Sequence, residues 1–273
     1  MNRKAMNRND TGNNNVDTAK ELPTVLSLCT GYGGIERGLE LAGLEHRVLA
    51  HVEIEAFAIA NLVAKMETNQ LPPAPIWTNL KTLPVDCFRD RVHILTSGYP
   101  CQPFSAAGKR AGKEDPRHLW PHIKEIIRAV RPVRCFFENV EGHISLGLRE
   151  VISDLEGLGY RTAWGIFSAR EVGAPHQRKR VYILADSTSI RLQGLRPRGE
   201  QESYPHGQEE LSMCESQRPE YATWEAEPRV CRVVDGCADR VDRIRLLGNS
   251  VVPRTAAKAW LTLQQQIEDS TIA

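Results

Sequence analysis

The residues that decide the fold are Thr24-Val-Leu-Ser-Leu-Cys-Thr-Gly-Tyr-Gly-Gly-Ile-Glu36. They begin with a short apolar run, 24–28, that is typical of a buried strand, and a glycine-rich turn follows it. After the turn, Ile35, Leu39 and Leu41 recur at near-helical spacing. A strand, a turn and a helix in this order predict the first unit of an α/β domain, in which ligands bind at the carboxyl ends of the strands.

The strand–helix pattern recurs as far as residue 185. Further strands are expected at 47–53, 93–97, 133–137, 160–168 and 180–185. Helices are expected at 56–66, 119–130 and 148–158, and a turn followed by a last helix at 241–267. Because helices alternate with most of these strands, the sequence predicts an α/β fold with a doubly wound, mostly parallel sheet.

The composition limits the class of protein. The 273 residues suit one large α/β domain with a small appendage. Lys and Arg number 35 against 34 Asp and Glu, so any contact with nucleic acid has to be local rather than spread over a basic surface. No apolar run reaches the roughly 18 residues of a membrane-spanning helix, and the N-terminus lacks a signal-type apolar core, which favours a cytosolic chain without a membrane partner.

The seven cysteines are scattered and show no Cys-x-x-Cys spacing, which favours free thiols over disulfides or a structural zinc site. Small buried side chains are the interpretation for Cys87, Cys135 and Cys231. Cys101 differs from these because prolines flank it closely on a loop that leaves a strand, and the cationic segment 108–113 follows. Such a loop suits a nucleophilic thiolate and a lid, although a structural cysteine remains the alternative.

The turn after the first strand has the glycines of a cofactor loop. Gly31, Gly33 and Gly34 let the backbone approach a ligand at a helix N-terminus. About 20 residues later, Glu53 ends the next expected strand, where an acid can bind a ribose hydroxyl pair. Glu36 stands where the dinucleotide fingerprint needs glycine, and its charge disfavours a pyrophosphate. A nucleoside cofactor without phosphates is therefore favoured over plain turn glycines.

Two further groups of polar residues lie beside later strands, Glu138 at the end of one and the pair Arg178 and Arg180 just before another. Glu138 ends an apolar strand, where burial can raise its pKa, and a helix cap or a structural salt bridge is the alternative. Arg178 and Arg180 alternate on an extended segment, so both are expected to point the same way toward a phosphate or a base carbonyl, with a solvated basic face as the alternative. His118 and His122 lie four apart without a third ligand, so they are interpreted as surface residues and not as a metal site.

In their order along the chain, these residues resemble the DNA (cytosine-5) methyltransferase family. The resemblance covers about 24–185 and 241–260. Its most specific part is Pro100-Cys101-Gln102, which is similar to the family's nucleophile motif, while Glu138-Asn139-Val140 matches the glutamate motif and Arg178-x-Arg180 the paired-arginine motif. The catalytic residues implied by the resemblance are Cys101, Glu138, Arg178 and Arg180, and no metal is implied.

The remaining motifs resemble those that bind S-adenosyl-L-methionine in this family. Glu53 followed by Ile54 looks like the ribose-binding acid and the adenine-packing residue, and 248–251 looks like the last motif, which completes the cofactor pocket. The cofactor-binding residues implied by the resemblance are Gly31, Tyr32, Gly33, Gly34, Glu53, Ile54, Asn79, Leu80, Pro100, Leu119, Asn249 and Ser250.

The resemblance implies a reaction on a cytosine flipped out of double-stranded DNA. The Cys101 thiolate adds to C6, Glu138 hydrogen-bonds N3 and the exocyclic amine, and Arg180 with Arg178 binds O2 and a nearby phosphate. The loop 104–113 is expected to close over the base. The resemblance implies a monomer that acts in the cytoplasm of a bacterial or phage-infected cell. A cognate restriction endonuclease is an implied partner.

The resemblance also divides the chain. Residues 1–22 are expected to be a disordered tail, 23–186 with 246–268 the catalytic methyltransferase domain, and 187–245 a small, partly irregular target-recognition region. That region is reduced for the family, and its part 200–227 holds eight Glu and one Arg. The chain departs from the family's pattern in the cofactor motifs, at Ser27, Cys29 and Asn79. It also departs from the pattern just before the paired arginines, at His176.

Three other functions remain open at this point. An RNA cytosine-5 methyltransferase of the same fold would carry the same motifs. A catalytically silent DNA-binding relative is disfavoured because Cys101, Glu138 and Arg180 are all present. A nicotinamide-dependent, thiol-based dehydrogenase is disfavoured by Glu36 in the glycine loop.

Overall fold

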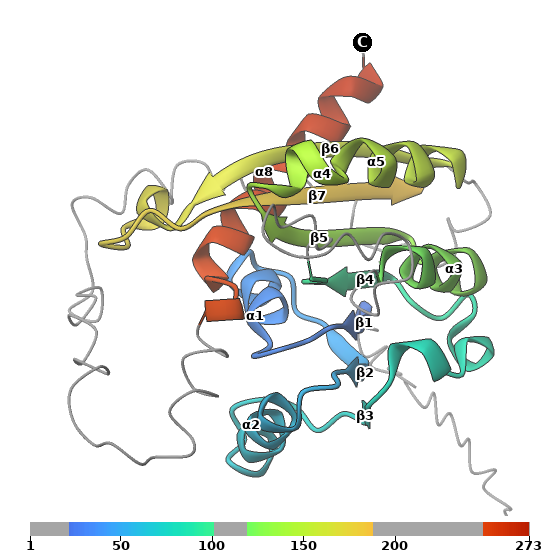
Figure 1. Ribbon diagram of the computed structural model, residues 1–273, viewed down its shortest axis with the longest axis vertical. Helices are drawn as coiled ribbons and strands as arrows, with labels where there is room; N and C mark the ends of the chain where they lie inside the picture. Colours follow the sequence, from blue (N-terminus) through green and yellow to red (C-terminus); the bar gives the residue numbers. More distant parts are fainter. Residues whose placement is uncertain (1–21, 101–118, 188–247, 273) are drawn as a thin grey trace, which may run out of the picture.

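A seven-stranded sheet in the order β3-β2-β1-β4-β5-β7-β6 forms the centre of the described part of the chain (Figure 1). The structure is a computed structural model and describes residues 22–100, 119–187 and 248–272. The strands are β1 (Thr24–Leu28), β2 (Arg47–Val52), β3 (Ile76–Trp77), β4 (Ile94–Ser97), β5 (Arg134–Val140), β6 (Tyr160–Ser168) and β7 (Lys179–Ser187). The helices are α1 (Gly34–Leu41), α2 (Ala56–Glu67), α3 (Trp120–Val130), α4 (His143–Leu146), α5 (Leu148–Gly157) and α8 (Pro253–Ile272), with the 3₁₀ turns η1 (Leu80–Thr82), η2 (Val85–Phe88) and η4 (Ala169–Val172).

The sheet is mostly parallel, as the alternation of strands and helices predicts. Strands β3, β2, β1, β4 and β5 pair in parallel, whereas β7 pairs antiparallel with both β5 and β6. The connection from β6 to β7 consists of residues 169–178, which is short for a crossover and allows an antiparallel return. The sequence pattern did not predict this antiparallel pair.

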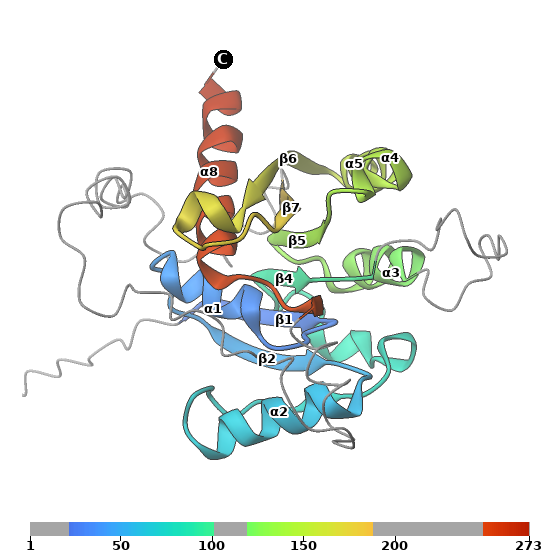
Figure 2. The ribbon, with the colours of Figure 1, turned by 60° about the vertical axis from the view of Figure 1, so that its left-hand side comes forward.

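Helices cover both faces of the sheet, and the alternation of side chains along each strand divides the core in two (Figure 2). On one face, Leu26 and Leu95 pack with the apolar side chains of α3 and α5. On the other face, Val25 and Ile94 pack with those of α1 and α8. The doubly wound fold expected from the sequence is therefore present.

Helices α1 and α8 approach each other unusually closely. A Cβ atom added to Gly38 of α1 would lie 2.6 Å from the Cβ of Ala256 in α8. A Cβ atom added to Gly34 would lie 2.7 Å from the carbonyl oxygen of Val251, just before α8. Only glycine leaves room for these contacts, so the segment that precedes α8 is held against the start of α1.

Some element boundaries and side-chain positions differ from the expectations. Strand β5 continues to Val140, because its last residues pair with β7, so Glu138 lies inside the strand rather than after it. Cys135 is buried as predicted, but the prediction for Cys87 was wrong, since this residue is exposed in η2. Cys231 lies outside the described residues.

Several expectations concern residues that the structure does not describe. These are the expected tail 1–21, Cys101 with the loop 104–113, His118, and nearly all of the expected recognition region, 188–245. Within the three described ranges, no helix combines the length and the apolar character needed to cross a membrane.

Candidate active site at the carboxyl edge of the sheet

The loop after β1 turns sharply to enter α1. Cys29, Gly31 and Gly33 all adopt positive φ angles, of 49°, 56° and 77°. Two of these three positions are glycines, for which this conformation carries no steric cost, while Cys29 adopts it with a side chain. The turn places backbone N–H groups at the carboxyl edge of the sheet, where β1, β2 and β4 all end.

Glu53 ties this loop to the end of β2. Its carboxylate accepts hydrogen bonds from the backbone N–H groups of Gly31, Ile54 and Glu55, at 2.7, 2.8 and 2.9 Å. The side chain is buried, and a carboxylate has about four acceptor sites, so it can accept further bonds from a ligand. Glu53 therefore shapes the loop and also offers an acceptor for a ribose hydroxyl group.

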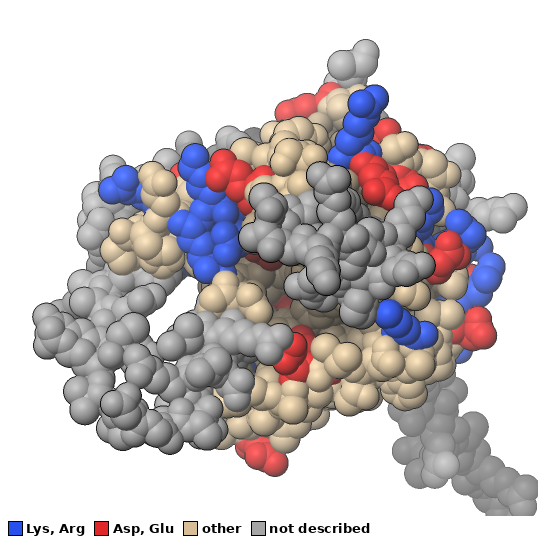
Figure 3. All heavy atoms as spheres, viewed as in Figure 1, with Lys and Arg blue, Asp and Glu red and all other residues tan. Residues whose placement is uncertain are grey.

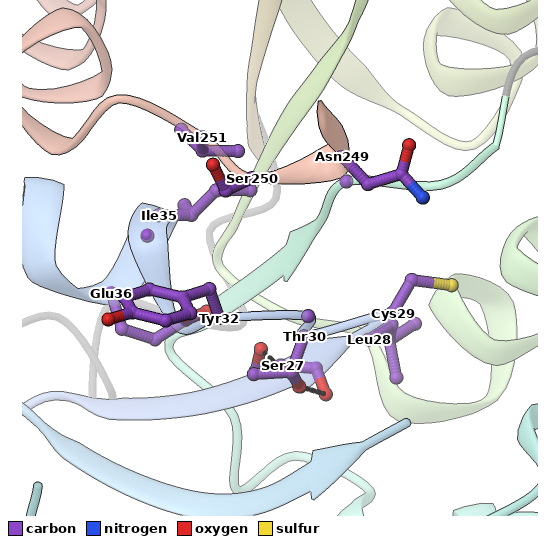
Figure 4. A pocket seen from close by; sticks show the side chains of 13 residues that line it. Ser27, Leu28, Cys29, Thr30, Tyr32, Ile35, Glu36, Asn249, Ser250 and Val251 are labelled. Atoms are coloured by element: carbon purple, nitrogen blue, oxygen red, sulfur yellow. Dashed lines mark hydrogen bonds between the residues drawn. The ribbon is translucent and has the colours of Figure 1, made fainter. Parts of the chain in front are cut away.

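A pocket lies between this loop and the segment that precedes α8 (Figure 4). The segment from Asn249 to Val251 forms one wall, and residues 27–36 form much of the other. The two walls are more than 200 residues apart in sequence, and the close approach of Val251 to Gly34 brings them together. Five of the residues implied as cofactor-binding line this pocket, namely Gly31, Tyr32, Gly34, Asn249 and Ser250.

Apolar side chains are exposed beside Glu53. Ile54 is 72% exposed, and Trp77, at the end of the neighbouring strand β3, is 41% exposed. The Trp77 indole N–H donates to the hydroxyl of Thr82, and the Asn79 side chain caps η1 by accepting from the N–H of Lys81. An exposed apolar surface next to a buried acid fits a nucleoside. Trp77 belongs to this surface, although no sequence motif indicated it.

The glycine loop already indicated Glu36, but no sequence motif indicated Lys65 beside this loop. Glu36 lines the pocket although it is buried, and it accepts a 2.6 Å hydrogen bond from the Thr96 hydroxyl. Lys65 of α2 lies over the Tyr32 ring, 3.1 Å from its centroid, and donates to the Tyr32 carbonyl. Burial lowers the pKa of Lys65 to about 8. Lys65 lies on α2 at no characteristic spacing from the loop, so only the folded structure relates it to Tyr32.

Glu138 and Arg180 form an ion pair across β5 and β7. The Arg180 Nε lies 2.9 Å from the Glu138 carboxylate, and both side chains are largely buried. Burial raises the pKa of Glu138 to about 7, and the nearby Arg180 and Arg178 oppose this rise. A Cβ on Gly98, at the end of β4, would lie 3.5 Å from the Glu138 carboxylate. A proton-holding acid therefore faces the chain that leads to Pro100 and Cys101.

The two arginines of the pair do not point the same way, so that expectation was wrong. Arg178 has a positive φ angle of 30°, which interrupts the extended backbone before β7 begins. Its guanidinium donates to the carbonyl oxygens of Gly248 and Ser250, whereas Arg180 binds Glu138. The structure therefore places Arg180 at the acid and Arg178 at the wall of the pocket.

The chain before Cys101 is anchored from the opposite face of β5. Asn139 donates a 3.1 Å hydrogen bond to the Tyr99 carbonyl, and the Tyr99 hydroxyl lies 3.0 Å from Nε2 of His143 in α4. Tyr99 and His143 are both buried, and their rings meet edge to face. Pro100 follows directly, so this contact fixes the start of the nucleophile motif.

Cys29 and Cys135 lie in surroundings that disfavour a thiolate. Burial raises the pKa of Cys29 to about 12, and burial also raises the pKa of Cys135. Both thiols therefore stay protonated at neutral pH. Cys101 lies outside the described residues, so its role as the nucleophile remains a prediction.

Two of the residues implied as cofactor-binding have other surroundings. Leu80 is buried in the core beside α3, and Leu119 packs against the same cluster. Neither lines the pocket, so their contact with a cofactor stays a prediction. Among residues 22–100, 119–187 and 248–272, no three His, Cys, Asp or Glu side chains gather as a metal site would require.

Basic side chains gather beside the site. Figure 3 shows Lys and Arg side chains over the connection between β6 and β7, on the left of the view. The basic residues of this connection and of the start of β7 are Arg170, Arg178, Lys179 and Arg180. This gathering agrees with the expectation that a nearly neutral chain carries a local positive surface.

Part of this chain is similar in sequence to known proteins. The family model described as C-5 cytosine-specific DNA methylase matches residues 23–225. The Type II methyltransferase M.NgoBV of Neisseria gonorrhoeae is 33% identical over 174 residues, which cover 58% of this chain and 40% of that protein. The Type II methyltransferase M.NaeI of Lentzea aerocolonigenes is 32% identical over 166 residues, or 59% of this chain and 39% of that protein. The chain thus spans about 40% of the length of these relatives.

Two solved structures are similar in fold to this chain. The Dnmt2 methyltransferase of S. pombe has a TM-score of 0.51 and 26% identity, with coverage of 62% of this chain and 51% of that one. A DNMT2 variant of Spodoptera frugiperda has a TM-score of 0.52 and 25% identity, with the same coverage. With the family model matching well over half of its length, this chain belongs to the C-5 cytosine-specific DNA methylase family.

Proposed function

We propose that this protein transfers a methyl group from S-adenosyl-L-methionine to C5 of a cytosine flipped out of double-stranded DNA, through a covalent bond between Cys101 and C6. Membership of the family supports cytosine C5 as the acceptor. The single observation that carries the mechanism is the buried Glu138–Arg180 pair, because a carboxyl group with a pKa near 7 can hold a proton for a base ring at neutral pH.

The pocket suits the proposed cofactor. Glu53 offers an acceptor for ribose hydroxyl groups, and the exposed Ile54 and Trp77 offer an apolar surface for adenine. Glu36 in the lining disfavours phosphates and suits a cofactor with a positive charge. We expect Gly31, Gly34, Asn249 and Ser250 to enclose the amino-acid end. When bound, S-adenosyl-L-methionine supplies an electrophilic methyl group.

The protein's own residues prepare the cytosine for that methyl group. The Cys101 thiolate forms a bond to C6, and the electron pair of the C5–C6 double bond moves into the ring, which makes C5 nucleophilic. Glu138 donates its proton toward N3 and neutralises the charge that builds there, while Arg180 hydrogen-bonds O2. After C5 is methylated, a base takes the C5 proton and Glu138 takes back the proton from N3, so the C5–C6 double bond forms again and the Cys101 thiolate is expelled.

Substrate and mechanism can be tested in one set of assays. Purified protein with labelled S-adenosyl-L-methionine should label duplex DNA at cytosine C5 and leave RNA unlabelled. Incorporation into RNA alone would support the RNA methyltransferase instead. A DNA duplex that the protein methylates should trap it covalently when 5-fluorocytosine replaces the target, since fluorine cannot leave C5 as a proton. If no adduct forms, the thiol mechanism is wrong.

The relatives' names support a wider proposal about partners and setting. Those two relatives are named Type II methyltransferases, and this naming supports a role beside a cognate restriction endonuclease in the cytoplasm of a bacterial or phage-infected cell. We expect the protein to act as a monomer on DNA. Residues 187–245 are proposed as the small recognition region, and 23–186 with 246–268 as the catalytic domain.

A further inference from the structure

The Arg178 side chain joins two segments that are 70 residues apart in sequence. Its Nη2 group donates to the carbonyl oxygens of Gly248 and Ser250, at 2.7 and 2.5 Å. We propose that Arg178 is a positioning residue that holds the 248–251 wall of the cofactor pocket, instead of binding the target base or a DNA phosphate as its motif implies. This inference rests on the proposed function, because it names the part that Arg178 plays in the same site.

The wall that Arg178 holds is part of the pocket itself. The two bonded carbonyls stand on either side of Asn249, and Asn249, Ser250 and Val251 all line the pocket. On the far side of this segment, Val251 rests against Gly34, where no side chain fits. The wall is therefore fixed between α1 and the Arg178 guanidinium. Loss of the Arg178 hydrogen bonds should let this segment move away from the glycine loop.

An arginine suits this role better than it suits base recognition here. One Nη2 amino group carries two hydrogens and can donate to each carbonyl, and charged donors make stronger hydrogen bonds than neutral ones. The positive φ angle turns Arg178 away from the line of β7, while Arg180 keeps the strand conformation and reaches Glu138. Both Nη2 hydrogens are used by these two carbonyls, so a DNA contact through Nη2 would replace a bond to the wall.

The placement of the two arginines also links the two halves of the site. Arg180 contacts the acid proposed to bind the base, and Arg178, two residues earlier, contacts the wall of the cofactor pocket. Cofactor affinity should therefore depend on Arg178, and covalent capture of the base on Arg180. The neighbouring Lys179 is exposed and lies 3.8 Å from Glu141, so it provides a matched loss of charge without contact to the wall.

The test compares Arg178→Ala, Arg178→Lys and Lys179→Gln with the wild type. Binding of S-adenosyl-L-homocysteine is measured calorimetrically without DNA, and binding of a mixed-sequence DNA duplex is measured at several salt concentrations. We expect Arg178→Ala to weaken cofactor binding about tenfold or more, and Arg178→Lys to weaken it less. Guanidinium at millimolar concentration should restore part of the affinity of Arg178→Ala. Lys179→Gln should leave cofactor binding unchanged.

Hydrogen exchange provides a readout that needs no cofactor. In Arg178→Ala, the peptide covering 248–260 should exchange faster than in the wild type, while peptides from β1 and β4 should not. Circular dichroism of the same samples shows whether each variant is folded. If Arg178→Ala does not fold, the exchange and binding measurements are made on Arg178→Lys instead.

The outcomes separate the inference from the proposed function. Unchanged cofactor affinity and unchanged exchange at 248–260, together with a DNA salt slope reduced by about one, would make Arg178 a phosphate ligand and overturn the inference. If the wild type binds neither S-adenosyl-L-homocysteine nor S-adenosyl-L-methionine, the proposed cofactor is wrong, and the exchange measurement alone decides whether Arg178 holds the wall.

Discussion

At the scale of single residues, the neighbours of Glu138 set its chemistry. Burial inside β5 raises its pKa to about 7, although Arg180 and Arg178 oppose the rise. The ion pair with Arg180 orients the carboxyl group, and Gly98 leaves space beside it. An acid at the same position on a surface would be ionised at neutral pH and could not donate a proton to N3.

This raised pKa predicts a pH dependence. Covalent capture of 5-fluorocytosine DNA needs the protonated form of Glu138, which is lost as pH rises through about 7. It also needs the thiolate form of Cys101, whose population increases as pH rises. The rate should therefore pass through a maximum. In Glu138→Gln the amide cannot titrate, so a slower rate without the alkaline decline is expected. An unchanged decline in this variant would assign it to another group.

Cys101 carries the second prediction at this scale. Cys101→Ala and Cys101→Ser should abolish methyl transfer, because neither side chain supplies a thiolate for addition to C6. Calorimetric binding of S-adenosyl-L-homocysteine should stay close to that of the wild type. The control is Cys87→Ser, which changes an exposed thiol in η2 and should keep full activity. Full activity of Cys101→Ala would refute the assignment of the nucleophile.

His143 makes a prediction about stability. Burial lowers the pKa of His143 to about 4, below its ordinary value of about 6.5. Between these two values the unfolded chain binds more protons than the folded one, so the free energy of unfolding falls as pH drops, by about 1–3 kcal/mol. Urea denaturation at pH 7 and pH 5 should show this loss in the wild type. His143→Gln should show a smaller loss, whereas the exposed control His122→Gln should not differ from the wild type.

At the scale of elements, the contact between α1 and α8 shapes the pocket. Gly38 and Ala256 allow the two helices to meet, and Gly34 accepts Val251. Because this contact carries the 248–251 segment to the glycine loop, helix packing and the shape of the pocket depend on the same residues. The strand β5 has a comparable double role, since successive residues Glu138 and Asn139 face opposite sides of the sheet, toward Arg180 and Tyr99 respectively.

A pair of glycine substitutions tests the helix contact. In Gly38→Ala the new methyl group would lie 2.6 Å from Ala256, so the helices must separate, at a cost of about 1–3 kcal/mol in the free energy of unfolding. Gly157→Ala, in α5, is the control because nothing lies within 4 Å of its added Cβ. That change should be neutral or stabilising by roughly 0.5–1 kcal/mol. Equal stability of the two variants in urea denaturation would contradict the close packing.

At the scale of the whole molecule, the distribution of charge matters more than its sum. The formal net charge is +1, yet basic side chains gather over the β6–β7 connection (Figure 3). DNA bound there should be held by a few phosphate contacts, and its affinity should fall as salt rises. A double variant with Arg170→Gln and Lys179→Gln should reduce the slope of log affinity against log salt by about two. An unchanged slope would place the DNA elsewhere.

The sequence predicted most of this fold because local patterns dictate it. The strands at 24–28 and 160–168 and the helix at 56–66 were located by periodicity alone, within a residue or so of their observed ends. The antiparallel return of β7 was not predicted, because pairing between strands depends on the length of the connection and on which edge is free. The motif order indicated Glu138 and Glu53, but it gave no sign of Trp77 or Lys65 at the site.

The sequence by itself determined the family, the identity of the reacting residue types and the order of the motifs along the chain. The tertiary structure decided how they combine: that residues 249–251 close the loop of 31–34, that Glu138 has a raised pKa, and that Arg178 and Arg180 point to different partners. The physical reason is that burial, ion pairing and close packing arise between segments distant in sequence. A local pattern specifies which side chains are present, and only the packed chain specifies what each one touches.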